Sequence, residues 1–75
     1  MKIKRLGASK TILALPSGSE IFYSYDTPVA AQVSGEFYKT KEYYSRTTNK
    51  HITEYLNGRY AHPVEQSFIN QIVGN

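Results

Sequence analysis

The residues best suited to chemistry stand together in one short segment, YYSRTTNKHITEYL (residues 43–56). Within seven positions it holds three hydroxyls, two cations and one imidazole: Ser45, Arg46, Thr47, Thr48, Lys50 and His51. A hydroxyl beside an imidazole is the core of a nucleophile–base pair. Hydroxyls and cations at the start of a helix can instead hold a phosphate or a carboxylate. The elements that position these side chains decide between a nucleophile–base pair and an anion site.

The hydroxyls fit the start of a helix. Ser and Thr just before an apolar-periodic run are typical of helix N-termini, where a side-chain oxygen accepts from an unpaired amide and contributes about 1 kcal/mol. Ser45 can cap a helix that begins at Arg46, and Thr47 one that begins at Thr48. No glycine-rich loop precedes them, so the segment is not a phosphate-binding loop. We interpret the hydroxyls as caps, with an anion site as the alternative.

The sequence places no complete set of catalytic or metal-ligating residues around the imidazole. His51 lies beside Tyr55 at the border of the apolar helix face. Ser45, His51 and Glu54 could be drawn as a triad, but no strained nucleophile turn is present and so short a chain has little room for a water-excluding pocket. His51 and His62 lack further ligands at a recognised spacing. We therefore predict that the protein is not an enzyme and has no catalytic residue, metal site or cofactor.

A second candidate site is the aromatic–basic segment, residues 37–46. Aromatic side chains interleaved with cations are typical of platforms that stack single-stranded nucleic acid. In a strand, however, alternation puts Phe37 and Tyr38 on opposite faces, so one of them must face the core. A solvated sheet edge and a partner-binding surface both fit this pattern. The candidate partner- or nucleic-acid-binding residues are Tyr38, Lys39, Lys41, Tyr43, Tyr44, Arg46 and Lys50.

Length and composition limit the classes of protein. Seventy-five residues make one domain, which buries only about 60% of its unfolded surface. The absence of cysteine excludes disulfides and thiolate chemistry. Self-association as a homodimer would supply stability that the small core lacks. No apolar run approaches the roughly 20 residues of a membrane-spanning helix, and we expect no membrane partner.

The charge is unevenly distributed. The formal net charge is +3, and four cations stand in the first ten residues: Lys2, Lys4, Arg5 and Lys10. Residues 11–75 carry five cations against six acids. A dedicated DNA-binding domain usually shows a dense basic face, which this near-neutral body lacks. The seven tyrosines suit half-buried sheet surfaces and interfaces.

The first half of the chain has the period of strands. Ile21, Tyr23 and Tyr25 alternate with Phe22 and Ser24. Turn residues follow at Pro16–Ser19 and Ser34–Gly35, and a bulge or bend is expected at Asp26–Pro28. The strands expected are 11–15, 20–25, 29–33 and 36–41.

The second half has the period of helices. Thr48, Ile52 and Leu56 fall on one face at 3.6-residue spacing, and Gly58 is suited to a left-handed C-cap. Pro63 is placed as the first residue of a second helix. The buried stripe expected for that helix is Val64, Phe68, Ile69, Ile72 and Val73.

Together these patterns predict one α+β domain over residues 11–75. It consists of an antiparallel three- to four-stranded meander followed by two short helices packed on one face. Residues 1–10 form a basic segment that is either an edge strand or partly disordered, and the sequence favours the second.

Two segments together resemble a known family. FYSYDTPVAAQV (residues 22–33) and YSRTTNKHITEYL (residues 44–56) are similar to small, uncharacterised accessory proteins of tailed bacteriophages, in which an SYxTPVA strand segment precedes an SxTTxxH helix start. The resemblance covers residues 22–56 and assigns no activity. It implies one linked structural motif made of Ser24, Tyr25, Thr27, Pro28, Ser45, Thr47, Thr48 and His51. In physical terms, His51 and the hydroxyls would tie the helix start to the interrupted strand.

We therefore expect a binding protein that acts in the cytoplasm of an infected bacterium. Its partner would be a host or phage protein complex, and inhibition of a host defence or nucleic-acid-processing complex is the sharpest form of this hypothesis. Direct nucleic-acid binding through the aromatic–basic segment is the first alternative. A self-associating virion or assembly protein is the second.

Overall fold

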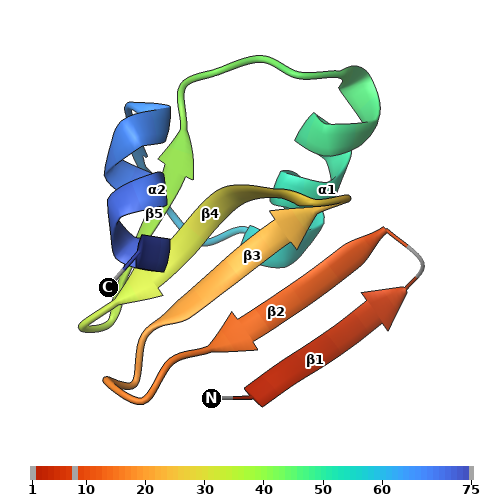
Figure 1. The fold of residues 1–75 in the computed structure, drawn as a ribbon. Helices are drawn as coiled ribbons and strands as arrows, with labels where there is room; N and C mark the ends of the chain where they lie inside the picture. Colours follow the sequence, from red (N-terminus) through yellow and green to blue (C-terminus); the bar gives the residue numbers. More distant parts are fainter. Residues whose placement is uncertain (1, 8, 75) are drawn as a thin grey trace.

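Six strands form one sheet whose spatial order follows the chain, and two helices complete the fold (Figure 1). The computed structural model describes residues 2–7 and 9–74. Its elements are β1 (Lys2–Gly7), β2 (Lys10–Ala14), β3 (Glu20–Ser24), β4 (Thr27–Val33), β5 (Glu36–Thr40), α1 (Arg46–Leu56), β6 (His62–Val64) and α2 (Gln66–Gly74). The predicted α+β class, with an antiparallel meander and two helices, is confirmed. The sheet has six strands rather than three or four.

Each strand from β1 to β4 pairs antiparallel with the next. Two of the connecting turns lie where turn residues predicted them. In the first, the Gly18 amide donates to the Leu15 carbonyl at 3.0 Å, and Gly18 has φ of 93°. In the second, Ser34 and Gly35 have φ of 53° and 81°. Both residues of this two-residue turn therefore adopt the left-handed conformation that a tight hairpin requires.

The interruption expected around Asp26–Pro28 is a reversal of the chain followed by a bulge. Tyr25 and Asp26 form a turn between β3 and β4, and Tyr25 has a left-handed φ of 58°. Phe22 pairs with Ala30, but the next residue of β3 pairs with Pro28. Val29 is therefore the extra residue of a β-bulge, and both Val29 and Ala30 belong to the same buried cluster.

The basic N-terminal segment contributes the edge strand. Residues 2–7 form β1, which pairs with β2 from Lys2 opposite Ala14 to Gly7 opposite Lys10. The sequence favoured partial disorder for this segment, and the structure has the other alternative, an edge strand. Met1 and Ala8 lie outside the described residues.

The strand β6 was not predicted. It pairs parallel to β5, with Tyr38 opposite His62 and Lys39 opposite Pro63. The prediction that Pro63 begins a helix is wrong, because α2 begins only at Gln66. An edge strand tolerates proline because its missing amide need not face a neighbouring strand.

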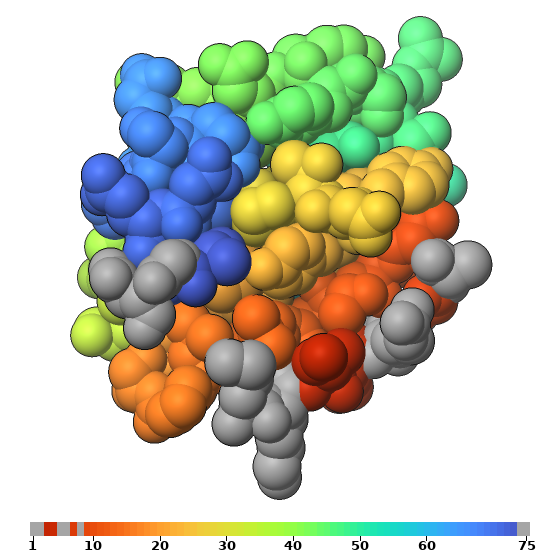
Figure 2. All heavy atoms as spheres, viewed as in Figure 1, coloured from red at the N-terminus to blue at the C-terminus, as the bar shows by residue number. Residues whose placement is uncertain are grey.

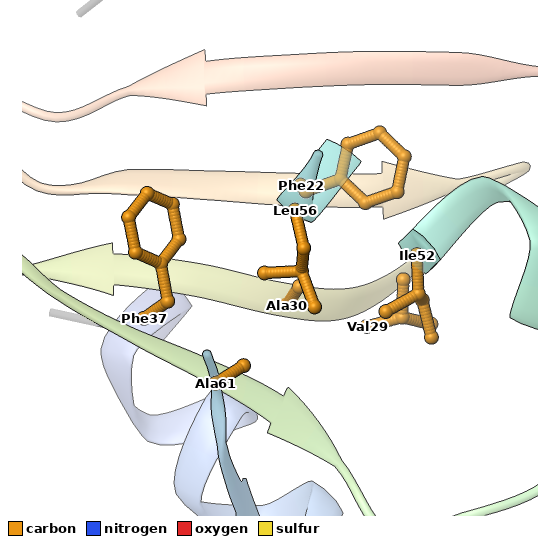
Figure 3. Close-up of a cluster of buried hydrophobic side chains, with 7 residues drawn as sticks. All are labelled: Phe22, Val29, Ala30, Phe37, Ile52, Leu56 and Ala61. Atoms are coloured by element: carbon orange, nitrogen blue, oxygen red, sulfur yellow. The ribbon is translucent and has the colours of Figure 1, made fainter. Parts of the chain in front are cut away.

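The helix α1 covers one face of the sheet. Phe22 and Ala30 are neighbours on that face, and they share a buried cluster with Ile52 and Leu56 of α1 (Figure 3). The remaining buried members of the cluster are Val29, Phe37 and Ala61. A helix is needed here because parallel strands cannot be joined by a tight turn.

The helix α2 covers the opposite face. Ala31 and Tyr38 are register partners on that face, and the Tyr38 ring lies 5.2 Å from the Phe68 ring of α2. In Figure 1, α2 lies in front of the sheet and α1 behind it. The prediction that both helices share one face is therefore wrong. Figure 2 shows that α2 covers only part of its face and that strands β2 to β4 remain visible beside it.

Tyr55 of α1 yields a prediction about the core. Its ring stacks on Phe22 at 4.5 Å and meets Phe37 edge-on at 6.0 Å. Its buried hydroxyl has no hydrogen-bond partner of normal geometry among the described residues, although the Glu20 side chain lies near it. Tyr55→Phe keeps both ring contacts and removes the unpaired hydroxyl, so we expect the free energy of unfolding to rise by about 1 kcal/mol. Urea denaturation at pH 7 measures this change, and a loss of stability would show that the hydroxyl is bonded.

The same substitution has a pH-dependent signature. Burial, followed by the nearby Glu20 carboxylate, raises the pKa of Tyr55 to about 12 from its ordinary value of 10.0. Between these pH values the unfolded chain has lost the phenolic proton and the folded chain has kept it. Stability is therefore lost as the pH rises from 10 towards 12. Tyr55→Phe should lose less stability than the unmodified protein across this interval, and parallel losses would contradict the assignment.

Candidate interaction surfaces

The hydroxyl-rich segment does form a helix start. Ser45 is the N-cap of α1, with an extended backbone, and its Oγ accepts from the Thr48 amide at 3.0 Å. Of the two caps considered, the structure has Ser45 rather than Thr47, whose side chain is exposed. At the other end, Asn57 and Gly58 both adopt left-handed conformations, with φ of 50° and 84°.

Behind the cap lies a buried network that joins β3 to α1. Ser24, at the end of β3, is 1% exposed. Its Oγ lies 3.1 Å from the Thr48 Oγ1 and 2.8 Å from the His51 Nδ1. Ser45 extends the network by donating to the Thr48 Oγ1 at 3.2 Å. Ser24, Thr48, Ser45 and His51 therefore hold the first turns of α1 against the sheet, and we call these four residues the hydroxyl–histidine network.

This network fits a structural role better than a catalytic one. The hydroxyl nearest the imidazole is that of Ser24, which is too buried to reach a substrate. No carboxylate among the described residues is hydrogen-bonded to His51. The imidazole therefore lacks both an accessible nucleophile and an orienting acid.

The predicted motif is brought together only in part. Tyr25 joins the network through its ring, 5.8 Å from that of His51, and Thr27 pairs with Ser24 in the sheet. The carbonyl of Pro28 instead accepts from the Gln66 Nε2 of α2 at 2.7 Å. Thus His51 ties the helix to the end of β3, and a different side chain holds the interrupted strand.

Neither a metal centre nor a membrane span is found in the part of the chain that the structure describes. No three histidine or acidic side chains lie close enough together there to hold an ion. Across residues 2–7 and 9–74, both helices fall short of the length and apolar character needed to traverse a bilayer.

The aromatic–basic segment does not form one surface. Lys39, Lys41 and Tyr43 line a hollow of about 270 Å³ between the end of β5 and α1. The other residues of its lining are Thr40, Glu42, Asn49, Ile52 and Thr53. Tyr43 is 68% exposed, and its neighbours combine two cations with one acid. We call this site the lysine hollow.

The remaining candidates of that segment point elsewhere. Tyr38 faces α2, and the Tyr44 hydroxyl donates to the Gln66 Oε1 at 2.8 Å. Burial, followed by the charge of Glu42, raises the pKa of Tyr44 above its ordinary value. Arg46 and Lys50 are exposed on α1. Alternation along β5 and the bend after it therefore divide the segment between two faces.

A surface that the sequence did not reveal runs along the β5–β6 edge. It is a chain of four rings that we call the aromatic row: Tyr60, His62, Tyr38 and Phe68. Successive ring centroids are 5.1, 5.3 and 5.2 Å apart. Tyr60 is 74% exposed and Phe68 is 40% exposed.

The aromatic row is held by its surroundings. The His62 Nε2 lies 3.1 Å from the Glu36 Oε2, which fixes the imidazole between two tyrosines. Phe68 was predicted to be part of a buried stripe, but among the residues of α2 whose burial is described only Ile69 is fully buried. Tyr60 and His62 alternate with the buried Ala61, but three residues are too few to indicate a strand, so no signal in the sequence placed these rings together.

A six-stranded sheet with one helix on each face defines this chain as a small α+β protein. The chain belongs to a family of unknown function, DUF8033, whose family model matches residues 1–71. Comparisons with curated proteins and with solved structures gave no match. Membership of the family brings no activity with it, so function must be argued from the surfaces above.

The hydroxyl–histidine network predicts a stability defect. His51→Ala leaves the buried Ser24 hydroxyl with one partner fewer, and we expect the free energy of unfolding to fall by about 1–2 kcal/mol. Chemical denaturation measures the change, and partner binding by the protein that remains folded should be retained.

Thr47 provides the matched control. It is a hydroxyl in the same helix turn but is exposed, so Thr47→Ala should change stability by less than about 0.5 kcal/mol. If His51→Ala abolished binding with no change in stability, the network would be a binding site and the structural assignment would be wrong.

Proposed function

We propose that this protein is a small phage-encoded binding protein that engages a host or phage protein in the cytoplasm of the infected bacterium. The resemblance of residues 22–33 and 44–56 to phage accessory proteins supports the proposed phage origin. The exposed aromatic row supports the mode of action. In its sharpest form, the proposal is that binding inhibits a host defence or nucleic-acid-processing complex.

The observation that carries the proposal is the aromatic row itself. Aromatic side chains are enriched at the centres of protein interfaces, where they supply much of the binding energy. In this row, Tyr60 contacts His62, His62 contacts Tyr38, and Tyr38 contacts Phe68. Side chains that are already held by neighbours lose little rotamer entropy when a partner covers them.

Charge near the aromatic row favours a protein over a polyanion. Glu36 lies against His62, and the Lys41 Nζ lies 3.6 Å from the Glu65 carboxylate just before α2. Arg59, next to Tyr60, is held by the Leu56 carbonyl at 2.9 Å and lies over the Phe37 ring. Arg59 and Lys41 are thus engaged within the fold, whereas a nucleic-acid site needs its cations free to meet phosphates.

Direct nucleic-acid binding is the second candidate function, and the lysine hollow favours it. Lys39 and the exposed Tyr43 combine a charge with a ring that could stack on a base, and Lys41 adds a second charge that Glu65 offsets in part. The acid Glu42 shares the lining and weakens the attraction for phosphate. This candidate therefore ranks below protein binding.

Tyr60 and Tyr43 form a matched pair that separates the two functions. Both are highly exposed tyrosines, at 74% and 68%, but only Tyr60 belongs to the aromatic row. Affinity capture from infected-cell lysate, with and without nuclease, measures retention of a partner. We expect Tyr60→Ala to weaken capture by about tenfold or more and Tyr43→Ala to leave it unchanged, with no effect of nuclease.

The opposite outcomes would contradict protein binding. If nuclease abolishes capture, or if Tyr43→Ala weakens it while Tyr60→Ala does not, the partner is a nucleic acid or is held through one. A ring or larger oligomer in size-exclusion chromatography would support the assembly alternative instead.

The lysine hollow has its own test. If it binds single-stranded nucleic acid, affinity must fall steeply with added salt, and Lys39→Gln with Lys41→Gln must reduce the salt slope by about two phosphate contacts. Gel shifts over a salt series measure this. The absence of any shift at low salt would exclude the second candidate.

A further inference from the structure

The two edges of the sheet are protected very differently. At one edge, β6 has only three residues and contains Pro63. At the other edge, β1 has six residues and pairs on one side with β2, while no described strand lies beyond it (Figure 1). The outer backbone groups of an edge strand are a template for another strand unless the edge is short, bulged, covered or charged, and edge lysines such as Lys2 and Lys4 deter strands that do not neutralise them. Among the strands that the structure describes, β1 is thus the one with an open edge of more than three residues, and its regular pairing runs from Lys2 to Arg5, before the register shifts between Arg5 and Gly7.

The formal charge of β1 selects what can pair with it. Residues 1–19 carry four cations and no acid. Lys10 is engaged with Glu54 of α1 at 3.2 Å. The other three cations, Lys2, Lys4 and Arg5, belong to the edge strand by sequence, and the side chain of Lys4 is exposed. The remaining residues, 20–75, carry five cations and six acids. The open edge is therefore basic, and the rest of the protein is close to neutral.

A second copy of this chain is a poor occupant of the edge. In an antiparallel pair, like charges directly opposite each other destabilise the sheet. When β1 is paired with β1 of a second copy over five or more residues, each register sets Lys4 against Lys4, Lys4 against Arg5, or Arg5 against Arg5. The charges that repel a copy attract a strand of opposite sign.

The two faces at this edge differ in character. Ile3 is 67% exposed, and its register partner on the same face is Leu13. Lys4, which is also exposed, lies on the opposite face. A strand placed beside β1 would present apolar or β-branched residues next to Ile3 and acids next to Lys4, in alternation.

We propose that the outer edge of β1 is a docking site for an acidic extended segment of a partner protein, which joins the sheet as a seventh strand. The segment contributes main-chain hydrogen bonds to the open edge, and its alternating acids and apolar residues contribute specificity. The site lies at the opposite edge of the sheet from the aromatic row. This docking site can therefore be tested independently of the function proposed above.

The test uses the whole protein and a short fluorescent peptide in which glutamate alternates with valine and threonine. Fluorescence anisotropy should detect saturable binding, and hydrogen exchange should show new protection of amides in β1. The same peptide with N-methyl groups along one backbone edge keeps its charge but loses its donors, so it should bind at least about tenfold more weakly. Equal binding of the N-methylated peptide would overturn strand addition.

Lys4 and Lys50 provide the matched variants. Both are exposed lysines, so Lys4→Glu and Lys50→Glu change the net charge equally. We expect Lys4→Glu to weaken the acidic peptide by about tenfold or more and Lys50→Glu to leave it unchanged, with circular dichroism showing both variants folded. If both variants weakened peptide binding equally, net charge alone would explain the effect and the proposed site would be refuted.

Two further measurements separate the proposal from its rivals. Tyr60→Ala should leave peptide binding intact, because the aromatic row is a different surface. A single-stranded oligonucleotide that bound β1 more tightly than the peptide did, or a dimer that protected β1 in the absence of peptide, would show that the edge has another occupant and would overturn the proposal.

Discussion

The parallel pairing of β5 with β6 is the constraint on which both helices depend. A chain that leaves one strand and returns parallel to it must cross a face of the sheet. The helix α1 makes this crossing over the face of Phe22, where Ile52 and Leu56 bury its apolar side. When the chain leaves β6 at the edge, the face of Ile21 is still open, and α2 packs there. The same pairing sets His62 beside Tyr38, so one constraint produces both the two-faced core and the aromatic row.

The hydroxyl–histidine network complements this arrangement. Hydrophobic contact holds the middle and end of α1 to the sheet but does not by itself fix where the helix begins. Ser24 fixes that point, because a buried hydroxyl needs partners and finds them in Thr48 and His51. Residues that look catalytic in sequence therefore position a helix, which leaves the exposed surfaces as the places where function is to be sought.

The sequence predicted what is local. Alternation located Phe22 and Ser24 on one face, the Ser34–Gly35 pair predicted its turn, and Ser45 was among the caps considered. The sequence could not predict β6, because three residues are too few for a period and Pro63 also suits a helix start. Once β6 was missed, the parallel pairing was missed as well. The opposite placement of α2 and the meeting of Tyr60 and His62 with Tyr38 follow from that pairing, so neither could be predicted.

The order of the strands has a consequence for how the protein folds. From β1 to β5, each strand pairs with its neighbour along the chain, so these pairings close short loops and cost little chain entropy. The pairing of β5 with β6 must instead enclose all of α1, and we expect it to form last. By the same reasoning it opens most readily in the folded state. A partner that covers the aromatic row would bind only the form in which β5 and β6 are paired. Its binding would therefore stabilise the last part of the protein to fold.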